Sequence, residues 1–261
     1  MFPAPEDGSL FALAALAVTV AVLAAYAMSL ALFGRPSVER LDNEPGTVLL
    51  GRFPIEAFHW AARGVGRALV RTGVSPDALT VVSVALAALA VPLAATGRFE
   101  AAGALFAAGS VFDALAGIVA RSRGAASDAG EMLDATVDRY ADALGFMGLA
   151  IFYRDSDWRL AIVLAALLGS MMVSYVRAKA DALGIALGPG LMRRPERVAY
   201  LSLALLLGPT LSSWIAPSDP TRPATLLVVA LIAALSNVAA LRLLFEGRAR
   251  LRDKQAMEGG A

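Results

Sequence analysis

Three carboxylates and one guanidinium lie in a stretch whose neighbours are apolar enough to cross a membrane. They are Asp113, Asp134, Asp138 and Arg121, within residues 113–138. Charged side chains inside a membrane are costly, so a cluster of them marks a functional site by default. These residues are therefore the first candidates for chemistry in this chain.

Helical spacing predicts that the carboxylates meet. Asp134 and Asp138 are four residues apart, and Asp142 continues the same helical face. The preceding helix ends in the loop 122–133, so we expect two antiparallel neighbours with Asp113 on the facing side. Close carboxylates repel one another unless a cation neutralises them. Ligands that are all oxygen suit Mg²⁺, Mn²⁺ or Ca²⁺, and Mg²⁺ completes its shell with substrate phosphates.

The alternative is a set of ordinary ion pairs between these aspartates and arginines nearby in the sequence. The arginines in question are Arg121, Arg123 and Arg139. One such pair is plausible. Three aspartates at helical spacing, beside the small residues Gly117, Ala120 and Gly130, favour a site for a metal ion and a phosphate.

The composition indicates an all-helical integral membrane protein. The chain has 261 residues, of which 58% are hydrophobic and 17% are charged, and its mean hydropathy is +0.65. A soluble domain of this length carries more charge. Cysteine is absent, which excludes disulfides and thiolate chemistry, and a single histidine, His59, excludes a histidine-based metal site.

Seven segments are apolar and long enough to span a bilayer, which takes about 20 residues. They are residues 8–34, 78–97, 101–120, 134–153, 160–176, 198–218 and 223–241. The first follows the acidic sequence MFPAPEDG and is longer than the apolar core of a signal peptide. We therefore expect a membrane anchor and not a cleaved leader.

Basic residues predict the orientation in the membrane. Most arginines and lysines fall in residues 34–76, 121–133, 177–197 and 242–261, which would all lie on one side. By the positive-inside rule that side is cytoplasmic. We expect a multi-pass protein of the cell (inner) membrane, with its N-terminus outside, its C-terminus cytoplasmic and the carboxylates at the cytoplasmic face.

One membrane domain with two appendages is expected. Residues 1–50 would form an N-terminal transmembrane anchor and a cytoplasmic linker, residues 51–245 the membrane domain, and residues 246–261 a polar cytoplasmic tail. Within the domain, residues 51–72 repeat polar side chains every three or four positions, which is typical of an amphipathic helix. Such a helix can lie at the membrane surface. A short helix packed on the protein is the alternative.

The charged residues resemble the signature of the CDP-alcohol phosphotransferase family, DxxDGxxAR, eight residues, then GxxxDxxxD. Seven of the eight defining positions match: Asp113, Gly117, Ala120, Arg121, Gly130, Asp134 and Asp138. The resemblance extends over roughly residues 50 to 245. SYVRAKADALG (174–184) and RRPER (193–197) are similar to the branch that makes inositol- or glycerol-phosphate lipids. The resemblance implies a six-helix core, to which residues 8–34 add one transmembrane helix and residues 51–72 an interfacial helix.

The implied activity is transfer of a phosphatidyl group from CDP-diacylglycerol, or a similar CDP-lipid, to a polyol or polyol phosphate, with release of CMP. Two Mg²⁺ or Mn²⁺ ions would be held by Asp113, Asp134 and Asp138, and Asp138 would also be the catalytic base that takes the proton of the acceptor hydroxyl. A homodimer is implied as well, and no nucleic acid is expected among the partners.

Two further sets of residues receive predicted roles. By the same resemblance the CDP-lipid would contact Asp77, Thr80, Gly117, Ala120, Arg121, Ser127 and Gly130. A phosphate on the acceptor would need cations, for which we predict Arg177, Lys179, Arg194 and Arg197. The alternative for these cations is that they only fix the orientation by facing lipid headgroups.

Ala116 departs from the signature, which has a second aspartate at that position. A methyl group cannot coordinate a metal, and the spare carboxylates of Asp128 and Asp142 are poorly placed to replace it. Three explanations stay open: a divergent member with a weakened site, a pseudoenzyme that binds CDP-lipid without turnover, and an inactivating substitution. A transporter is a further class of function, but carboxylates at one membrane boundary, away from the midplane, count against it.

Overall fold

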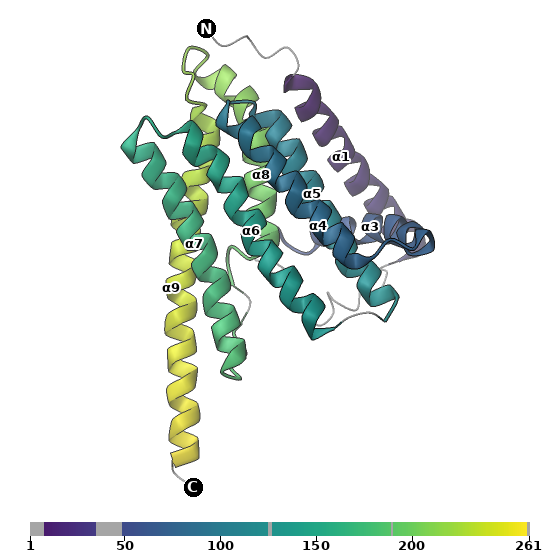
Figure 1. Ribbon diagram of the computed structural model, residues 1–261, viewed down its shortest axis with the longest axis vertical. Helices are drawn as coiled ribbons and strands as arrows, with labels where there is room; N and C mark the ends of the chain where they lie inside the picture. Colours follow the sequence, from purple (N-terminus) through teal and green to yellow (C-terminus); the bar gives the residue numbers. More distant parts are fainter. Residues whose placement is uncertain (1–7, 35–48, 125–126, 189, 260–261) are drawn as a thin grey trace.

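The computed structural model describes residues 8–34, 49–124, 127–188 and 190–259, and these form an all-helical bundle without strands (Figure 1). Eight helices are present in this part of the chain: α1 (Gly8–Phe33), α3 (Phe53–Thr72), α4 (Pro76–Ala95), α5 (Phe99–Ser122), α6 (Asp128–Phe152), α7 (Asp157–Ala182), α8 (Arg194–Ile215) and α9 (Pro223–Gly259). The predicted fold class is confirmed. Most of the expected linker before residue 50 lies outside the described residues.

Six of the described helices are long and apolar enough to cross a membrane, namely α1, α4, α5, α7, α8 and α9. The chain is therefore a multi-pass membrane protein, as predicted. The remaining expected span is also a helix, the 25-residue α6, but charged residues such as Asp138 and Asp142 interrupt its apolar sequence, so it is not among these six. α6 thus carries charged side chains along a segment that we expected to span the membrane.

The amphipathic helix α3 runs across the bundle at the end of α1 (Figure 1). Pro54 stands in its first turn, where the missing N–H costs nothing, and Gly73 follows its last turn at a φ of 80°, which suits glycine. The helix packs on α1 and α5, and the Tyr26 hydroxyl of α1 donates to the buried Glu56 carboxylate at 3.0 Å. The predicted helix is confirmed, and one face of it is packed on the protein.

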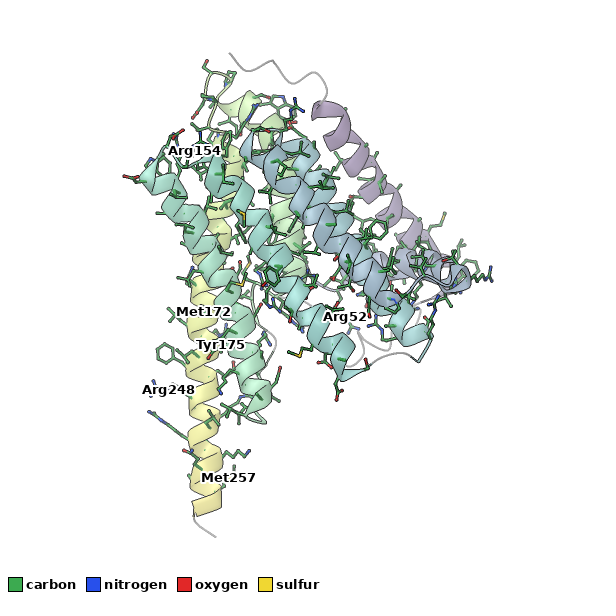
Figure 2. The ribbon with its side chains drawn as sticks, viewed as in Figure 1. Arg52, Arg154, Met172, Tyr175, Arg248 and Met257 are labelled. Carbon is green, nitrogen blue, oxygen red and sulfur yellow. The ribbon has the colours of Figure 1, made fainter. Side chains whose placement is uncertain are left out.

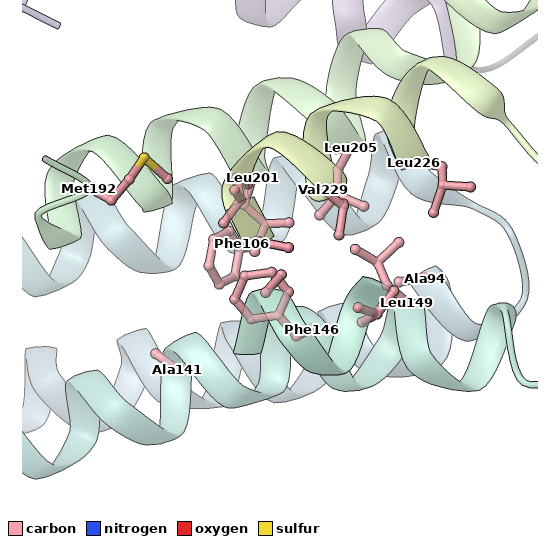
Figure 3. Packing of buried hydrophobic residues seen from close by; sticks show 14 of the residues in the cluster. Ala94, Phe106, Ala141, Phe146, Leu149, Met192, Leu201, Leu205, Leu226 and Val229 are labelled. Carbon is pink, nitrogen blue, oxygen red and sulfur yellow. The ribbon is translucent and has the colours of Figure 1, made fainter. Parts of the chain in front are cut away.

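Small residues let the core helices approach closely. A Cβ atom at Gly109 of α5 would lie 2.7 Å from the Ser83 carbonyl oxygen of α4, and one at Gly148 of α6 would lie 2.6 Å from Ala94 of α4. α4 therefore packs against both helices at short range, as small residues allow between membrane helices. Larger side chains fill the centre of the bundle, among them Phe106, Phe146, Leu149, Leu201 and Leu205 (Figure 3).

The helices α7 and α9 lie side by side and extend beyond the others (Figure 1). α9 has 37 residues, so it is about 55 Å long, whereas the hydrocarbon core of a bilayer is about 30 Å thick. It continues to Gly259 through the region where we expected a separate polar tail. The sequence there consists mainly of good helix formers, and an ion pair joins Glu246 to Arg250 at 2.7 Å one turn on.

The basic segments that the structure describes gather toward one end of the molecule. Arg52 and Arg248 lie toward the end of the bundle where α9 projects, and Arg154 lies at the opposite end (Figure 2). The end of α5 and the start of α6 belong to the first of these ends (Figure 1). The predicted carboxylate cluster therefore lies toward the basic end of the bundle.

Candidate metal and phosphate site

The helices that carry the carboxylates both rest on α4. We expected α5 and α6 to be antiparallel neighbours, and Phe106 of α5 does lie against Gly145 of α6. Each of the two helices nevertheless packs mainly on α4. The turn between α3 and α4 is tied to α5 by Arg123, whose guanidinium donates to the carbonyl oxygens of Val70 at 2.9 Å and Val74 at 2.8 Å. At the other side of the loop, Ser127 begins α6 and its hydroxyl accepts from the Gly130 N–H at 3.1 Å. These contacts set the ends of the two helices that carry the aspartates.

The structure brings the three predicted metal-binding aspartates together. Asp113 of α5 and Asp134 and Asp138 of α6 each offer one oxygen atom, and these atoms all lie within 4.8 Å of one another. Asp134 is exposed, whereas the side chains of Asp113 and Asp138 are only 13% and 15% exposed. The Asp113 Oδ1 atom is buried and accepts no hydrogen bond from the residues that the structure describes. A set of carboxylate oxygens with unused acceptor capacity suits Mg²⁺ or Mn²⁺.

An arginine from a third helix lies among these carboxylates. Arg194, the first residue of α8, places Nη1 2.9 Å from Asp113 Oδ2 and Nη2 2.7 Å from Asp138 Oδ1. Its Nε atom is 3.6 Å from Asp142 Oδ1. Its side chain is 19% exposed. Arg194 therefore bridges α5 and α6 by contacting an aspartate on each.

The ion pairs differ from those that we weighed in the sequence. Of the three arginines named there, Arg139 does approach an aspartate, with Nη1 3.8 Å from Asp142 Oδ2. Arg123 instead bonds the carbonyl oxygens at the end of α3. The main partner of the cluster, Arg194, was missed because it lies 81 residues from Asp113 in the chain.

A buried scaffold holds the start of α8. Arg197 is 2% exposed, and its Nη2 atom donates to Asp142 Oδ2 at 2.7 Å. The same guanidinium donates to the Ser174 hydroxyl at 3.1 Å and to the Met192 carbonyl oxygen at 2.8 Å. Asp142 is itself 3% exposed, so this is a pair of opposite charges shielded from water. The one signal in the sequence for Asp142 was its spacing, four residues after Asp138.

Two further features fix the turn before α8. Glu196 is fully buried and accepts from the backbone N–H of Arg193 at 3.2 Å and of Leu49 at 2.8 Å. Met192 adopts a φ of 54°, which is uncommon for a side chain of this size. The carboxylate of Glu196 thus joins the start of α8 to the segment before α3, and this contact could not be anticipated from the sequence.

The residues predicted to bind the CDP-lipid lie around the ends of α4, α5 and α6. Asp77 is exposed in the first turn of α4, and Thr80 is buried one turn later. A Cβ atom at Gly117 would lie 3.1 Å from Arg121 Nη1, so the guanidinium of Arg121 folds back over this glycine. Ala120 neighbours Arg121 on α5, and Ser127 and Gly130 form the start of α6 described above.

The four cations predicted to bind the acceptor come from α7 and the start of α8. Arg194 and Arg197 contact the aspartates, as described. Arg177 is half-buried and donates from Nη2 to the Gly188 carbonyl oxygen at 3.3 Å. Lys179 is exposed and lines a separate, largely apolar hollow of about 120 Å³ between α7 and α9, together with Arg248.

Ala116 lies in an apolar cluster beside the aspartates. It is 3% exposed and belongs to a small group of buried side chains with Ala62, Leu79, Leu115 and Val119. A cavity of about 10 Å³, the size of one water, adjoins the site and is lined in part by Ser110, Asp113 and Arg194.

Comparison with known proteins identifies the family. The family model described as CDP-alcohol phosphatidyltransferase matches residues 73–245. The chain belongs to this family. Its members are transferases that depend on a metal ion, and the aspartate group described above could hold one. The resemblance seen in the sequence is confirmed.

Three relatives differ in how much of their length is matched. The phosphatidylinositol phosphate synthase of Mycobacterium tuberculosis (strain H37Rv) is 33% identical over 187 residues, which are 70% of this chain and 83% of the relative. The archaetidylinositol phosphate synthase of Pyrococcus horikoshii is 30% identical over 188 residues, 72% of this chain and 90% of the relative. The bifunctional IPC transferase and DIPP synthase of Rubrobacter xylanophilus is 42% identical over 149 residues, which are 54% of this chain but only 33% of that protein.

Solved structures show the same arrangement of helices. The crystal structure of M. tuberculosis phosphatidylinositol phosphate synthase (PgsA1) with CDP-DAG bound has a TM-score of 0.62 and 28% identity, and the match covers 71% of this chain and 92% of that one. The structure of the same enzyme in complex with manganese and citrate has a TM-score of 0.61, with coverage of 71% and 88%.

Proposed function

We propose that this chain transfers a phosphatidyl group from CDP-diacylglycerol to a polyol phosphate and releases CMP. The single observation that carries the proposal is the meeting of Asp113, Asp134 and Asp138 within 4.8 Å in a chain of this family. The carboxylate oxygens are the ligands that Mg²⁺ and Mn²⁺ prefer. When bound, such an ion neutralises the pyrophosphate of the donor and stabilises the charge that develops during transfer.

In the proposed reaction Asp138 is the catalytic base. Its carboxylate takes the proton of the acceptor hydroxyl, and the resulting oxygen nucleophile attacks the lipid-side phosphorus of CDP-diacylglycerol. A new P–O bond to the acceptor forms while the P–O bond to CMP breaks, and CMP leaves with the electron pair. The remaining catalysis is positioning of the two reactants by the protein.

Residues around the helix ends would hold the donor. The proposed contacts are Asp77, Thr80, Gly117, Ala120, Arg121, Ser127 and Gly130. Small side chains at Gly117 and Ala120 leave room for the CDP group beside α5. A guanidinium such as that of Arg121 is a strong hydrogen-bond donor to phosphate oxygens, which supports its place in this set.

Cations would hold the phosphate of the acceptor. We retain Arg177, Lys179 and Arg194 as proposed contacts, because each has N–H donors that do not all bond buried protein groups. Arg197 is buried and pairs with Asp142 at 2.7 Å, which favours a supporting role in which it fixes the start of α8. The proposed location is the cytoplasmic face of the cell (inner) membrane, in a homodimer.

A second candidate function is binding of CDP-lipid without turnover. Two observations favour it: Ala116 offers no oxygen atom, and Arg194 contacts two of the three aspartates. The two functions share a ligand and differ in product. They are therefore separable by a single assay of turnover.

The test measures CMP release by the purified full chain in nanodiscs that contain CDP-diacylglycerol. Inositol phosphate, glycerol phosphate, inositol, glycerol and serine are supplied in turn, with Mn²⁺, with Mg²⁺ or with EDTA, for the chain as it is and for Ala116→Asp. We expect metal-dependent CMP release with one of the phosphorylated polyols. Binding of CDP-diacylglycerol with no release in either form would establish the second function and contradict the first.

A further inference from the structure

We propose that Arg123 is a positioning residue for the donor lipid, because its guanidinium holds the start of α4 against the end of α5. The inference rests on the proposed function, since it concerns the proposed donor site. The Nη1 atom of Arg123 donates to the Val74 carbonyl oxygen at 2.8 Å, and the Nη2 atom donates to the Val70 carbonyl oxygen at 2.9 Å. A longer hydrogen bond of 3.4 Å joins Nη1 to the Gly73 carbonyl oxygen.

The two helix ends that Arg123 joins carry the two halves of the proposed donor site. Asp77 and Thr80 belong to the first turns of α4, which begins at Pro76, directly after the bonded turn. Arg121 belongs to the last turn of α5, and Arg123 is the residue that follows this helix. A shift of one helix end against the other would therefore separate residues that have to contact the same CDP group.

The carbonyl oxygens at this position suit an arginine. The last four carbonyl groups of a helix have no partner within the helix, and Val70 belongs to the last four residues of α3. The same end of a helix carries a partial negative charge, which attracts a cation. The planar guanidinium presents several donors in fixed directions, so Arg123 bonds to Val70 and Val74 at once. It thereby fixes the direction in which the chain leaves α3 and enters α4.

Apolar packing alone does not fix this direction. A small cluster that includes Leu79 of α4 and Leu115 and Val119 of α5 brings the helices together beneath the hydrogen bonds. Apolar contacts are non-directional, so the helices can stay in contact without Arg123 while their ends move. The arrangement that binds the donor is then populated only in part, and the apparent affinity for the donor falls by that fraction.

Arg123 lies outside the residues that define the family signature. It stands in the interval of eight residues between Arg121 and Gly130, where the signature specifies no residue type. Val70 precedes residues 73–245, which the family model matches. The hydrogen bonds of Arg123 therefore join the signature to a helix that precedes the matched domain.

The experiment compares Arg123→Gln with Arg71→Gln in the full chain with Mn²⁺. Arg71 is exposed in the last turn of α3, so the control removes the same charge close by and leaves the hydrogen bonds of Arg123 intact. CMP release gives kcat and the KM for CDP-diacylglycerol. The dissociation constant of CDP-diacylglycerol is measured separately, from the rise in unfolding temperature with the lipid content of detergent micelles.

We expect Arg123→Gln to raise both the KM and the dissociation constant about tenfold, the size of one lost hydrogen bond from a charged group, and to leave kcat within about twofold. Arg71→Gln should leave all three unchanged. Arg123→Lys keeps the charge without the planar fork, so its two constants should rise about threefold. This second variant decides the question if Arg123→Gln aggregates.

An unchanged dissociation constant in a folded Arg123 variant overturns the inference, even where the unfolding temperature falls, because the arginine then only stabilises the end of α3. An equal loss of affinity in Arg71→Gln overturns it as well. CMP release by the unchanged chain, with equal donor affinity in the Arg123 variants, rejects the inference and leaves the proposed function standing. Weaker donor binding in these variants, without CMP release by the unchanged chain, rejects the function and leaves the inference standing.

Discussion

The site has an acidic half and a basic half that are built in different ways. The acidic half consists of Asp113, Asp134 and Asp138 on α5 and α6, which are partly open to solvent, and Asp113 Oδ1 accepts no hydrogen bond from the described residues. The basic half is the start of α8, residues 192–197, where Met192, Glu196 and Arg197 are all buried and bonded. The acidic half is therefore free to accept a ligand, while the basic half is a rigid support from which only Arg194 reaches into the site.

This difference shows how charge is tolerated at the boundary of a membrane protein. In the basic half, Glu196 and Arg197 are buried and bonded within the protein, so that they contribute to a fixed structure. The acidic half gathers three carboxylates within 4.8 Å of one another, and Asp113 Oδ1 accepts no hydrogen bond from the described residues. Such a cluster is costly in a membrane protein unless a cation is bound. Substitutions in the acidic half should therefore affect activity most, and substitutions in the basic half should affect stability most.

The largest effect is expected from Asp138→Asn in the acidic half. Loss of a general base lowers the rate about 10³-fold, whereas an amide of the same shape leaves the packing intact. CMP release measures the rate, and the unfolding temperature in detergent measures the packing. Asp128→Asn, the same change at an exposed position in the first turn of α6, is the control and should retain activity. Equal losses in the two variants would refute the role of Asp138.

A large loss of stability is expected from Arg197→Met in the basic half. The substitution leaves the buried Asp142 without its main partner, which costs about 3 kcal/mol in the free energy of unfolding. Replacing both residues, as in Arg197→Met/Asp142→Leu, should recover most of that loss. Denaturant unfolding in detergent micelles provides the measurement.

The matched control for the basic half is Arg154→Met. Arg154 lies 3.7 Å from Asp155 at the exposed end of the bundle, where such a pair contributes less than about 0.5 kcal/mol. If Arg197→Met were no more destabilising than Arg154→Met, the rigid-support description of the basic half would be wrong.

The smallest predicted effect distinguishes two serines that cap helices. Ser127 caps α6 and Ser75 caps α4, with hydroxyl-to-N–H distances of 3.1 Å and 3.2 Å, so each Ser→Ala change should cost about 1 kcal/mol of stability. Ser127 is also a proposed contact of the CDP-lipid. Ser127→Ala alone should raise the apparent KM for CDP-diacylglycerol, by about fivefold for one lost hydrogen bond. An equal rise with Ser75→Ala would remove Ser127 from the donor site.

Local spacing was enough to predict the acidic half. The interval of four between Asp134 and Asp138 and the apolar runs on either side are properties of single helices, and helices follow from short-range periodicity. The same applies to α3, whose amphipathic pattern predicted its helix. The expected meeting of α5 and α6 holds for their aspartates. Spacing did not indicate that α4 packs against both helices through close contacts at Gly109 and Gly148.

The basic half depends on contacts between distant parts of the chain. Arg194 meets Asp113 across 81 residues, and Arg197 meets Asp142 across 55. No periodicity within α8 indicates which of its arginines reaches the aspartates. The polar tail expected from residue 246 on stays a prediction as a domain boundary, and local helix propensity explains why α9 continues through this polar segment to Gly259.

The most direct test of the proposed phosphatidyl transfer is the identity of the product. The full chain is incubated with CDP-diacylglycerol, Mn²⁺ and inositol phosphate or glycerol phosphate, and the lipids and nucleotides are analysed by mass spectrometry. The account predicts equimolar CMP and a phosphatidyl–polyol phosphate, both abolished by EDTA and by Asp138→Asn. Unchanged CDP-diacylglycerol with every acceptor, in a folded chain that binds Mn²⁺, would contradict it.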